Sequence, residues 1–161
     1  MNRRHFLSRT LLTVAGLTAL RQAPLAGAQA PKIDKVVKTE AEWRRLLTPA
    51  QFAVLREEGT ERPFTSPLND EKRKGTFVCA GCDLPLFDSR TKYDSGTGWP
   101  SFYDFLPGSI GTKTDFKLIY PRTEYHCARC GGHQGHVFND GPKPTGLRYC
   151  NNGVALKFLP A

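Results

Sequence analysis

Two pairs of cysteines constrain this chain more than any other feature of its sequence. Cys79-Ala-Gly-Cys82 and Cys127-Ala-Arg-Cys130 share the CxxC spacing, which lets one tight turn present two thiolates to a single ion. Two such turns complete a tetrahedral site of four cysteines, the usual form of a structural zinc site. Because four thiolates leave no open coordination position, we predict one structural Zn²⁺, held by Cys79, Cys82, Cys127 and Cys130.

Disulfides and a thioredoxin-like redox pair are the alternatives to a metal site. Disulfides are credible in an exported protein, but two turns of the same spacing favour a metal, and no βαβ pattern surrounds either pair. The pairs are separated by 44 residues, from Asp83 to His126, which is more than in a simple zinc ribbon. The segment between the pairs should therefore carry structure of its own.

The first 30 residues resemble an export signal. The start MNRRHFLSR is basic, and the apolar run at residues 11–20 is too short to span a bilayer as a permanent helix. Arg3-Arg4 followed by Phe6-Leu7 resembles a twin-arginine signal, with an ordinary secretory signal or an uncleaved anchor as alternatives. Cleavage after Ala28 fits the small residues there. We therefore expect a periplasmic protein with no stable membrane insertion after signal removal.

The formal net charge of +8 changes once this signal is set aside. Residues 1–30 carry four arginines and no acidic residue, so their removal leaves about +4 on the remaining chain. Nucleic-acid binding proteins usually show a concentrated basic stripe. A mildly basic chain without such a stripe gives little support to a nucleic-acid partner, and we expect none.

Two short helices are predicted after a linker at residues 31–38. Thr39 and Glu42 have the spacing of a capping box, and apolar residues follow them at helical spacing. Thr48-Pro49-Ala50-Gln51 repeats the signal, with Pro at the first helical position. This second helix should end at Gly59.

From residue 60 onward the pattern is that of short strands. Apolar runs at residues 76–78, 117–120 and 155–158 are separated by Gly, Pro, Asn and Asp, which is typical of antiparallel strands with many turns. The length of the chain suits a single domain, which we place at residues 39–161. The predicted fold class is mainly β with short N-terminal helices.

With four cysteines at the metal, Cys150 is left without a partner. A free cysteine is often a buried structural thiol, which is the simpler interpretation. If residues 147–152 form a strand, however, Arg148, Cys150 and Asn152 share one face, because side chains alternate. A guanidinium two residues from a thiol favours the nucleophilic thiolate. These neighbours therefore indicate a reactive cysteine.

A glycine-rich stretch upstream of Cys150, GGHQGHVFNDG at residues 131–141, holds two of the four histidines. Near neutral pH a histidine can donate or accept a proton, although a lone histidine can equally be structural. In a straight strand His133 and His136 would point to opposite faces. The glycines must therefore bend the chain if both histidines serve one site.

Trp99 lies in a third distinctive stretch, DSGTGWPSF at residues 94–102. Most tryptophans are largely buried in the core, and Trp99 could be one of them. Fixed between Gly98 and Pro100, it could equally form the wall of a small apolar pocket.

Together these stretches resemble the methionine-(R)-sulfoxide reductase B family. The matching segments run in the expected order from about residue 40 to the C-terminus: LTPAQFAVLREEGTERPFTSPLND, the two CxxC pairs, YDSGTGWPSF, GGHQGHVFNDGP and RYCNN. The resemblance implies a tent-like β fold of two antiparallel sheets and a structural zinc. A monomer is expected, although the sequence leaves the oligomeric state open. It also implies repair of methionine-(R)-sulfoxide in proteins or peptides under oxidative stress, with a thioredoxin-like reductant.

The resemblance assigns catalytic roles to five residues. Cys150 would attack the sulfoxide sulfur as a thiolate, giving methionine and a sulfenic acid on Cys150. His133 and His136 would polarise or protonate the sulfoxide oxygen. Arg148 would hold the thiolate, and Asn152 would add a hydrogen bond in the site.

Three further residues would bind substrate. The resemblance implies that Trp99 packs against the terminal methyl group and helps choose the epimer, since the two sulfoxide epimers need separate enzymes. Phe138 and Asp140 complete this set, and Asp140 would orient a histidine.

Two positions depart from the pattern of the family. Many relatives carry a second, resolving cysteine where this chain has Thr97, so an internal disulfide at Cys150 is not expected and an external thiol should reduce the sulfenic acid. Asn151 stands where relatives usually have an apolar residue. On the alternating pattern it points away from the site, so little consequence is expected.

Two rival hypotheses keep other classes of protein open. A thiol–disulfide oxidoreductase using one CxxC pair would have redox-cycling cysteines and no bound metal. A non-catalytic zinc-ribbon binding module would keep its function in Cys150→Ser, and Cys150 would not be unusually reactive at neutral pH.

Overall fold

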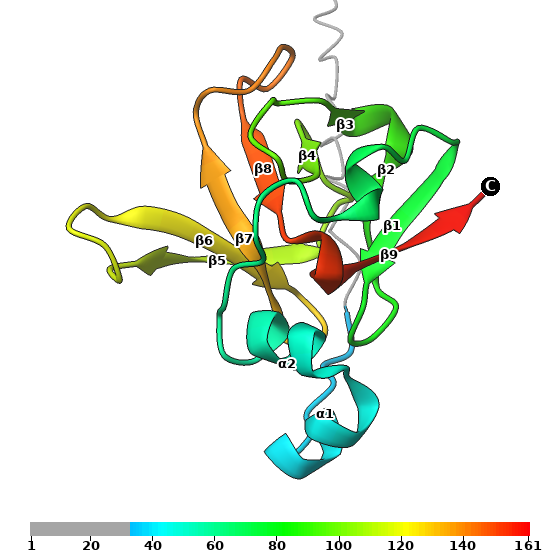
Figure 1. The fold of residues 1–161 in the computed structure, drawn as a ribbon, viewed down its shortest axis with the longest axis vertical. Coiled ribbons are helices and arrows are strands. Elements are labelled where there is room, and N and C mark those ends of the chain that lie inside the picture. Colours follow the sequence, from blue (N-terminus) through cyan, green and yellow to red (C-terminus); the bar gives the residue numbers. More distant parts are fainter. Residues whose placement is uncertain (1–32) are drawn as a thin grey trace, which may run out of the picture.

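Two antiparallel sheets form the body of the protein, and two short helices cover one end of it (Figure 1). The computed structural model describes residues 33–161, so the export signal expected at residues 1–30 lies outside the described residues. The helices are α1 (Glu40–Leu46) and α2 (Pro49–Leu55), with 3-10 turns η1 (Pro67–Asn69), η2 (Ser89–Thr91) and η3 (Gly153–Ala155). The strands are β1 (Gly75–Cys79), β2 (Pro85–Asp88), β3 (Lys92–Tyr93), β4 (Ser101–Phe102), β5 (Ile110–Asp115), β6 (Arg122–Cys127), β7 (His133–Phe138), β8 (Arg148–Asn151) and β9 (Leu156–Pro160).

The strand order places the predicted reactive segments side by side. The smaller sheet has the order β2-β1-β9, and the larger has the order β3-β4-β8-β7-β6-β5. All strand pairs are antiparallel. This confirms the predicted mainly β class with two antiparallel sheets, and it puts the histidine strand β7 beside the Cys150 strand β8.

Both helices begin as the sequence predicts. Thr39 with Glu42, and Thr48 with Gln51, form complete capping boxes, which satisfy the free amides of each first turn. Helix α2 ends at Leu55 rather than at Gly59. The last turn unwinds because Glu58 adopts a left-handed backbone with φ of 55°, a conformation that ends helices.

The core lies between the sheets and is rich in aromatic rings. The rings of Phe87 on β2 and Phe102 on β4 are stacked with centroids 4.1 Å apart. Phe77 on β1 also meets Phe102, edge to face, at 5.0 Å. Because each pair joins one sheet to the other and is worth about 0.5–1.5 kcal/mol beyond burial, these contacts fix the two sheets against each other.

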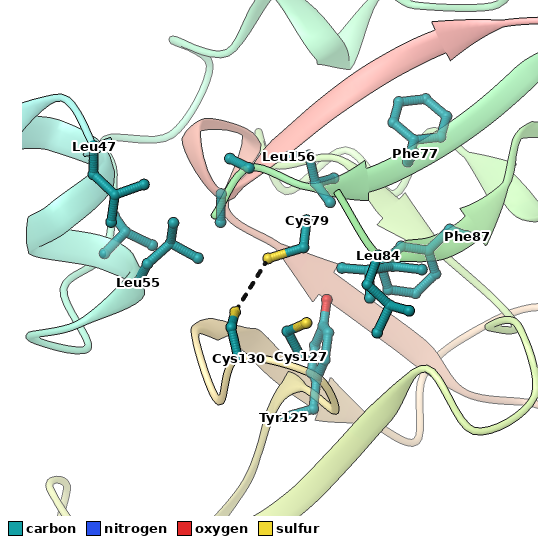
Figure 2. Close-up of a cluster of buried hydrophobic side chains, with 14 of the residues drawn as sticks. Leu47, Leu55, Phe77, Cys79, Leu84, Phe87, Tyr125, Cys127, Cys130 and Leu156 are labelled. Carbon is teal, nitrogen blue, oxygen red and sulfur yellow. Dashed lines mark hydrogen bonds between the residues drawn. The ribbon is translucent and has the colours of Figure 1, made fainter. Parts of the chain in front are cut away.

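The helical end of the core closes over the cysteine turns. Figure 2 shows Leu47 and Leu55 on one side of Cys79 and Cys130, and Leu84 on the other. All five side chains are buried. Apolar packing on both sides keeps water away from the sulfur atoms.

The predicted strand at residues 117–120 is wrong. These residues form the loop between β5 and β6, at the end of the long hairpin in Figure 1. The strand stops because the Asp115 carboxylate accepts the backbone N–H of Lys117 at 2.8 Å, a local turn that competes with strand pairing. The apolar residues that suggested a strand are therefore exposed.

The expected linker is attached to the domain over its described part, residues 33–38. The backbone N–H of Val36 donates to the carbonyl oxygen of Arg129 at 2.8 Å, and Lys35 Nζ donates to that of Ala128 at 2.7 Å. The segment thus lies against the second CxxC turn. Within residues 33–161 no helix is long and apolar enough to cross a membrane.

Candidate active site and metal centre

The two CxxC turns bring four sulfur atoms together where the two sheets meet. The Sγ atoms of Cys79 and Cys130 are 3.7 Å apart, and those of Cys82 and Cys127 are 3.5 Å apart. All four lie within 4.8 Å of one another. A disulfide needs an S–S distance of about 2.05 Å, so the disulfide alternative is wrong for this structure, in which all five cysteines are unpaired.

The arrangement fits a tetrahedral metal ion. Four thiolates about 2.3 Å from a central zinc ion would lie about 3.8 Å from one another, close to the measured separations. Hydrogen bonds among the four thiols raise the pKa of Cys79 and of Cys127 and lower that of Cys82 and of Cys130, because the four cannot all ionise side by side without a cation. The four cysteines are thus positioned to hold a metal, with the ligands that the sequence predicted.

A separate pocket of about 190 Å³ lies over β7 and β8. Five of the eight residues that the sequence predicted to be catalytic or substrate-binding line this pocket, whereas His133, Arg148 and Asp140 do not. The lining residues are Thr60, Trp99, Arg122, Gly135, His136, Phe138, Cys150, Asn151 and Asn152.

A bulge in β7 turns both histidines toward one region. Tyr125 of β6 pairs with Gly135 and His126 pairs with His133, so Gln134 has no partner residue opposite it. Such an extra residue bends the strand and changes which face the next side chains occupy. The ring centroids of His133 and His136 are consequently 5.5 Å apart. The bend required by the sequence argument is therefore present.

His136 lies directly opposite Cys150 in the strand register. Its Nε2 is 2.7 Å from the Asp115 carboxylate, which also binds Arg122 at 2.6 Å. The N–H of Lys117 and the His136 ring hold the pKa of Asp115 well below its ordinary value, so this carboxylate is ionised. Burial lowers the pKa of His136 despite Asp115. The neutral ring therefore donates from Nε2 and leaves Nδ1 as an acceptor.

His133 is buried behind the pocket and is held by Glu124. Its Nδ1 is 2.7 Å from one carboxylate oxygen, while His126 Nδ1 is 3.3 Å from the other. Burial acts to raise the pKa of Glu124, but the hydrogen bonds with His126 and His133 outweigh it and bring the pKa to about 2. The Nε2 of His133 is buried and has no partner within residues 33–161. A buried polar atom of this kind calls for a partner, such as a water or a substrate oxygen.

Cys150 is half-buried in the pocket and rests as a thiol. Burial raises the pKa of the Cys150 thiol above its ordinary value. The charge of Arg148 and hydrogen bonds with Thr97 and Arg148 lower it, but they do not offset burial. Arg148 thus favours the thiolate, as the sequence suggested, without making it the resting form.

Asp140 does not orient a histidine, and this prediction is wrong. Its carboxylate accepts two hydrogen bonds from Arg148, both at 2.8 Å. The Arg148 guanidinium also lies over the Phe138 ring, 4.3 Å from its centroid. Asp140 therefore fixes Arg148, while the histidines take their carboxylates from Asp115 and Glu124.

Trp99 and Asn152 are tied together by the backbone of Glu61. The indole N–H of Trp99 donates to the Glu61 carbonyl oxygen at 3.1 Å, and the Asn152 side-chain oxygen accepts the Glu61 N–H at 3.0 Å. The Glu61 carboxylate in turn accepts the N–H groups of Gly153 and Val154. Trp99 thus stands in the pocket wall, as one of the two sequence interpretations had it.

Asn151 has a larger role than its sequence position suggested. The side chain is fully buried, accepts the Tyr125 hydroxyl at 2.7 Å and donates to the Asn152 carbonyl oxygen at 2.7 Å. It also donates to Gln134, the bulged residue, at 3.4 Å. Asn151 therefore supports the bulge, which an apolar residue could not do, and it also lines the pocket, so the expectation that it lies apart from the site is wrong.

A row of hydroxyl groups runs from the core to Cys150. The Ser101 Oγ, which donates to the Trp99 carbonyl oxygen at 3.1 Å, is 2.8 Å from the Ser95 Oγ. The Ser95 Oγ is 2.8 Å from the Thr97 Oγ1, and Thr97 lies near enough to Cys150 to lower the pKa of its thiol. With Ser101 donating to Trp99, Ser101 accepts from Ser95 and Ser95 accepts from Thr97, so the Thr97 hydroxyl proton is used within the row.

Sequence reasoning missed the residues that support the histidines. Asp115, Arg122 and Glu124 come from the β5–β6 hairpin and were not selected. Arg122 and Glu124 did carry a weak signal, because their side chains share one face of a strand that leads to the second CxxC pair. Thr60, which also lines the pocket, carried none.

Fold and site together define a mainly β protein with a four-thiol metal centre and, apart from it, a pocket built around one cysteine and one histidine. The SelR domain family matches residues 47–160 of the chain. The chain therefore belongs to this family, that of the methionine sulfoxide reductases B, and is an oxidoreductase. The resemblance seen in the sequence is confirmed.

Curated relatives cover most of the chain. It is similar to the peptide methionine sulfoxide reductase MsrB of Pseudomonas putida (strain W619), with 57% identity over 129 residues, which are 80% of this chain and 97% of that protein. The MsrB of Agrobacterium fabrum is 54% identical over 127 residues, 78% of this chain and 94% of its own length. The chloroplastic peptide methionine sulfoxide reductase B1 of Arabidopsis thaliana is 43% identical over 166 residues, 97% and 82% of the two chains.

Proposed function

We propose that this chain reduces methionine-(R)-sulfoxide in proteins or peptides to methionine, with Cys150 as the nucleophile. The observation that carries the proposal is the position of Cys150, in a pocket directly opposite His136 and apart from the four metal-site thiols. The names of the relatives support the reaction class. The assignment of steps to residues rests on the geometry of the pocket.

The first step transfers an oxygen atom from one sulfur to another. Nδ1 of neutral His136 takes the proton of the Cys150 thiol and passes it to the sulfoxide oxygen. The thiolate attacks the sulfoxide sulfur and forms an S–S bond to it. The protonated oxygen then moves to the Cys150 sulfur, the S–S bond and the substrate S–O bond both break, and the thioether leaves with the electron pair of the S–S bond. Cys150 is oxidised by two electrons to the sulfenic acid, which keeps the proton, and the substrate sulfur is reduced by two electrons.

The charged groups behind the histidines match this proton movement. Asp115 fixes His136 in the tautomer that leaves Nδ1 free. Arg122 balances the charge of Asp115. His133, held by Glu124, offers its unpartnered Nε2 to the sulfoxide oxygen or to a water beside it.

The apolar wall of the pocket selects the substrate side chain. Trp99 and Phe138 both line the pocket with Cys150, and a thioether methyl group packs well against aromatic rings. With the methyl group against Trp99 and the sulfur facing Cys150, only one arrangement of the sulfoxide oxygen reaches the histidines. This is the physical basis we propose for the choice of the R epimer.

An external thiol, supplied by a thioredoxin-like partner, regenerates the enzyme. The other four cysteines are grouped at the metal centre, and Thr97 stands beside Cys150, so no further thiol is at hand. The reductant thiolate attacks the sulfenic sulfur and releases water, and a second thiol resolves the mixed disulfide.

Zinc is the metal that suits the four-cysteine centre, where it would serve structure rather than catalysis, since four thiolates leave no open position.

For the location of the protein, the twin-arginine-like residues 1–30 support export to the periplasm. There a monomeric enzyme would repair methionine residues oxidised by stress in envelope proteins.

Epimer-resolved turnover tests this proposal. The purified chain is given dithiothreitol and a dabsylated methionine sulfoxide separated into its R and S forms, with Cys150→Ser as the matched variant. We expect loss of the R form alone and none in Cys150→Ser. A folded, metal-loaded chain that consumes neither epimer would show the proposed activity to be wrong.

A further inference from the structure

The tip of the β5–β6 hairpin exposes a cluster of apolar side chains. Phe116, Leu118, Ile119 and Tyr120 are 76%, 47%, 106% and 63% exposed, and we call these four residues the hairpin tip. Elsewhere in residues 33–161 the large exposed apolar residues stand apart in the sequence. A contiguous apolar cluster that stays in water marks a surface that contacts another molecule.

The base of the hairpin is joined to the catalytic pocket. Asp115 ends β5, Arg122 begins β6, and the two form an ion pair at 2.6 Å. Arg122 lines the pocket, and Asp115 binds His136 at 2.7 Å. The hairpin tip therefore extends from the rim of the pocket, and Figure 1 shows it projecting away from the body of the protein.

The cations beside the hairpin tip are neutralised by carboxylates. Lys117 Nζ is 2.7 Å from the Glu58 carboxylate, which also pairs with Lys113. Lys113 Nζ is in addition 4.0 Å from the Glu124 carboxylate, and Arg122 is paired with Asp115, so three carboxylates face these three cations. A segment that binds anionic lipid usually combines apolar residues with free Lys or Arg, each worth about 1 kcal/mol at the membrane surface. The described charges thus favour a neutral apolar ligand over a membrane.

The shape of the hairpin tip favours a polypeptide segment over a second copy of this chain. A standard interface buries about 800 Å² on each partner, more than four side chains on a narrow loop supply. A symmetric dimer would also need the same patch to fit itself, whereas a projecting tip is convex. A short extended chain needs only a few contacts.

We propose that the hairpin tip binds apolar residues that flank an oxidised methionine in an unfolded or extended polypeptide, while the sulfoxide side chain enters the pocket. This proposal rests on the proposed function of the pocket. Methionine is an apolar residue that is most often buried with other apolar residues, so the sequence around it becomes available to the tip only when the client chain is unfolded. The continuity of tip and pocket through Asp115 and Arg122 makes one chain able to reach both.

Three substrates separate this role from a structural one. They are N-acetylmethionine-(R)-sulfoxide, a peptide with the sulfoxide between serine and glycine residues, and a peptide with leucine and phenylalanine in those places. In Leu118→Ser/Ile119→Ser we expect kcat/KM to fall about tenfold for the apolar peptide, as for the loss of one to two buried aliphatic contacts. For the other two substrates kcat/KM should stay within about twofold.

A matched variant controls for the loss of exposed apolar area in general. Val37→Ser/Leu46→Ser removes two side chains that are 91% and 60% exposed at the helical end of the fold, and it should leave all three values unchanged. Equal losses on all three substrates in the tip variant, or no loss on any, would overturn the proposal.

A binding measurement keeps this inference apart from the proposed activity. With Cys150→Ser as background, fluorescence anisotropy of the unoxidised apolar peptide should show binding that weakens about tenfold in Leu118→Ser/Ile119→Ser. If the wild-type chain turned over no sulfoxide, the proposed function would fail while this binding could still be present. Tip-dependent binding to anionic vesicles, or a tip-dependent dimer in sedimentation velocity, without peptide binding would assign the tip to those partners instead.

Discussion

His136 and Cys150 lie directly opposite each other on the adjacent strands β7 and β8. Opposed side chains on one face have Cβ atoms about 4.5–5.5 Å apart, which is a suitable distance for a proton to pass between ring and thiol. The far side of the imidazole is held by Asp115 at 2.7 Å. The sheet register thus supplies the base and its orientation without a contribution from the metal centre.

The first prediction concerns the acid limb of the pH profile. Burial lowers the pKa of His136, so the ring stays neutral to a lower pH than an ordinary histidine, whose pKa is about 6.5. We expect kcat/KM for N-acetylmethionine-(R)-sulfoxide to fall only below that value. The hydrogen bond with Asp115 raises the pKa of His136, so Asp115→Asn should move the acid limb to still lower pH.

The same profile carries its own control. Asp115→Asn should also lower kcat, because the tautomer of His136 is no longer fixed. His136→Asn should lose the acid limb together with most of the activity, by about 10²-fold or more. An acid limb that moved to higher pH in Asp115→Asn would contradict the assignment of His136.

The second prediction uses the two charged side chains that act on the pKa of Cys150. Arg148 lowers the pKa of the Cys150 thiol and Asp140 raises it. Arg148→Met should therefore move the midpoint of Cys150 alkylation by iodoacetamide to higher pH, and Asp140→Asn should move it to lower pH. Shifts of the same sign in both variants would show that Asp140 acts only by placing Arg148.

The third prediction concerns the hydroxyl row behind Cys150. With Ser101 donating to Trp99, Ser95 donates to Ser101 and Thr97 donates to Ser95. Thr97 can donate to a Cys150 thiolate only if all three hydroxyls turn when the proton leaves. Thr97→Val cannot do this and should raise the pKa of Cys150, because the Thr97 hydrogen bond lowers it. Thr97→Ser keeps the hydroxyl and should behave like the wild type in the same alkylation assay.

A change at the same position tests how the sulfenic acid is resolved. Thr97→Cys would place a second thiol beside Cys150. After one equivalent of R sulfoxide without reductant, thiol titration should show one thiol lost per wild-type chain and two lost per Thr97→Cys chain, since an internal disulfide forms only in the variant. Loss of two thiols in the wild type would mean that a metal-site cysteine takes part.

Local patterns predicted the parts of this fold that local physics decides. The capping boxes at Thr39 and Thr48 form as their spacing indicates, and the CxxC turns meet because each needs the other to complete a metal site. The alternation along residues 147–152 also placed Cys150 and Asn152 in one pocket, although Asn151, predicted on the other face, lines the pocket and Arg148 does not. In each case the contacts that decide the structure join residues a few positions apart in the sequence, or follow from the number of ligands that a metal ion needs.

Contacts set by long-range register could not be predicted from the sequence. Asp115 reaches His136, and Glu124 reaches His133, only because β5, β6 and β7 pair in one particular register with a bulge at Gln134. Residues 117–120 look like a strand because they are apolar. Their exposure depends on the turn at Asp115, which a hydrophobic pattern does not reveal.

The last prediction concerns the metal centre, which joins the two sheets. Cys79 ends β1 in the smaller sheet, and Cys127 ends β6 in the larger. An ion bound to both cysteines therefore cross-links the two sheets at the end of β6, the strand that also carries Glu124. We expect about one zinc per chain, and Cys82→Ser or chelation should lower the Tm by at least about 10 °C, because the binding free energy of a structural zinc is largely folding free energy. Cys150→Ser, which removes a thiol outside this group, should keep both the zinc and the Tm. If Cys82→Ser instead retained full zinc content and an unchanged Tm, the four-cysteine site would be wrong, and the approach of β1 and β6 would have to be explained by the apolar packing of Leu55 and Leu84 alone.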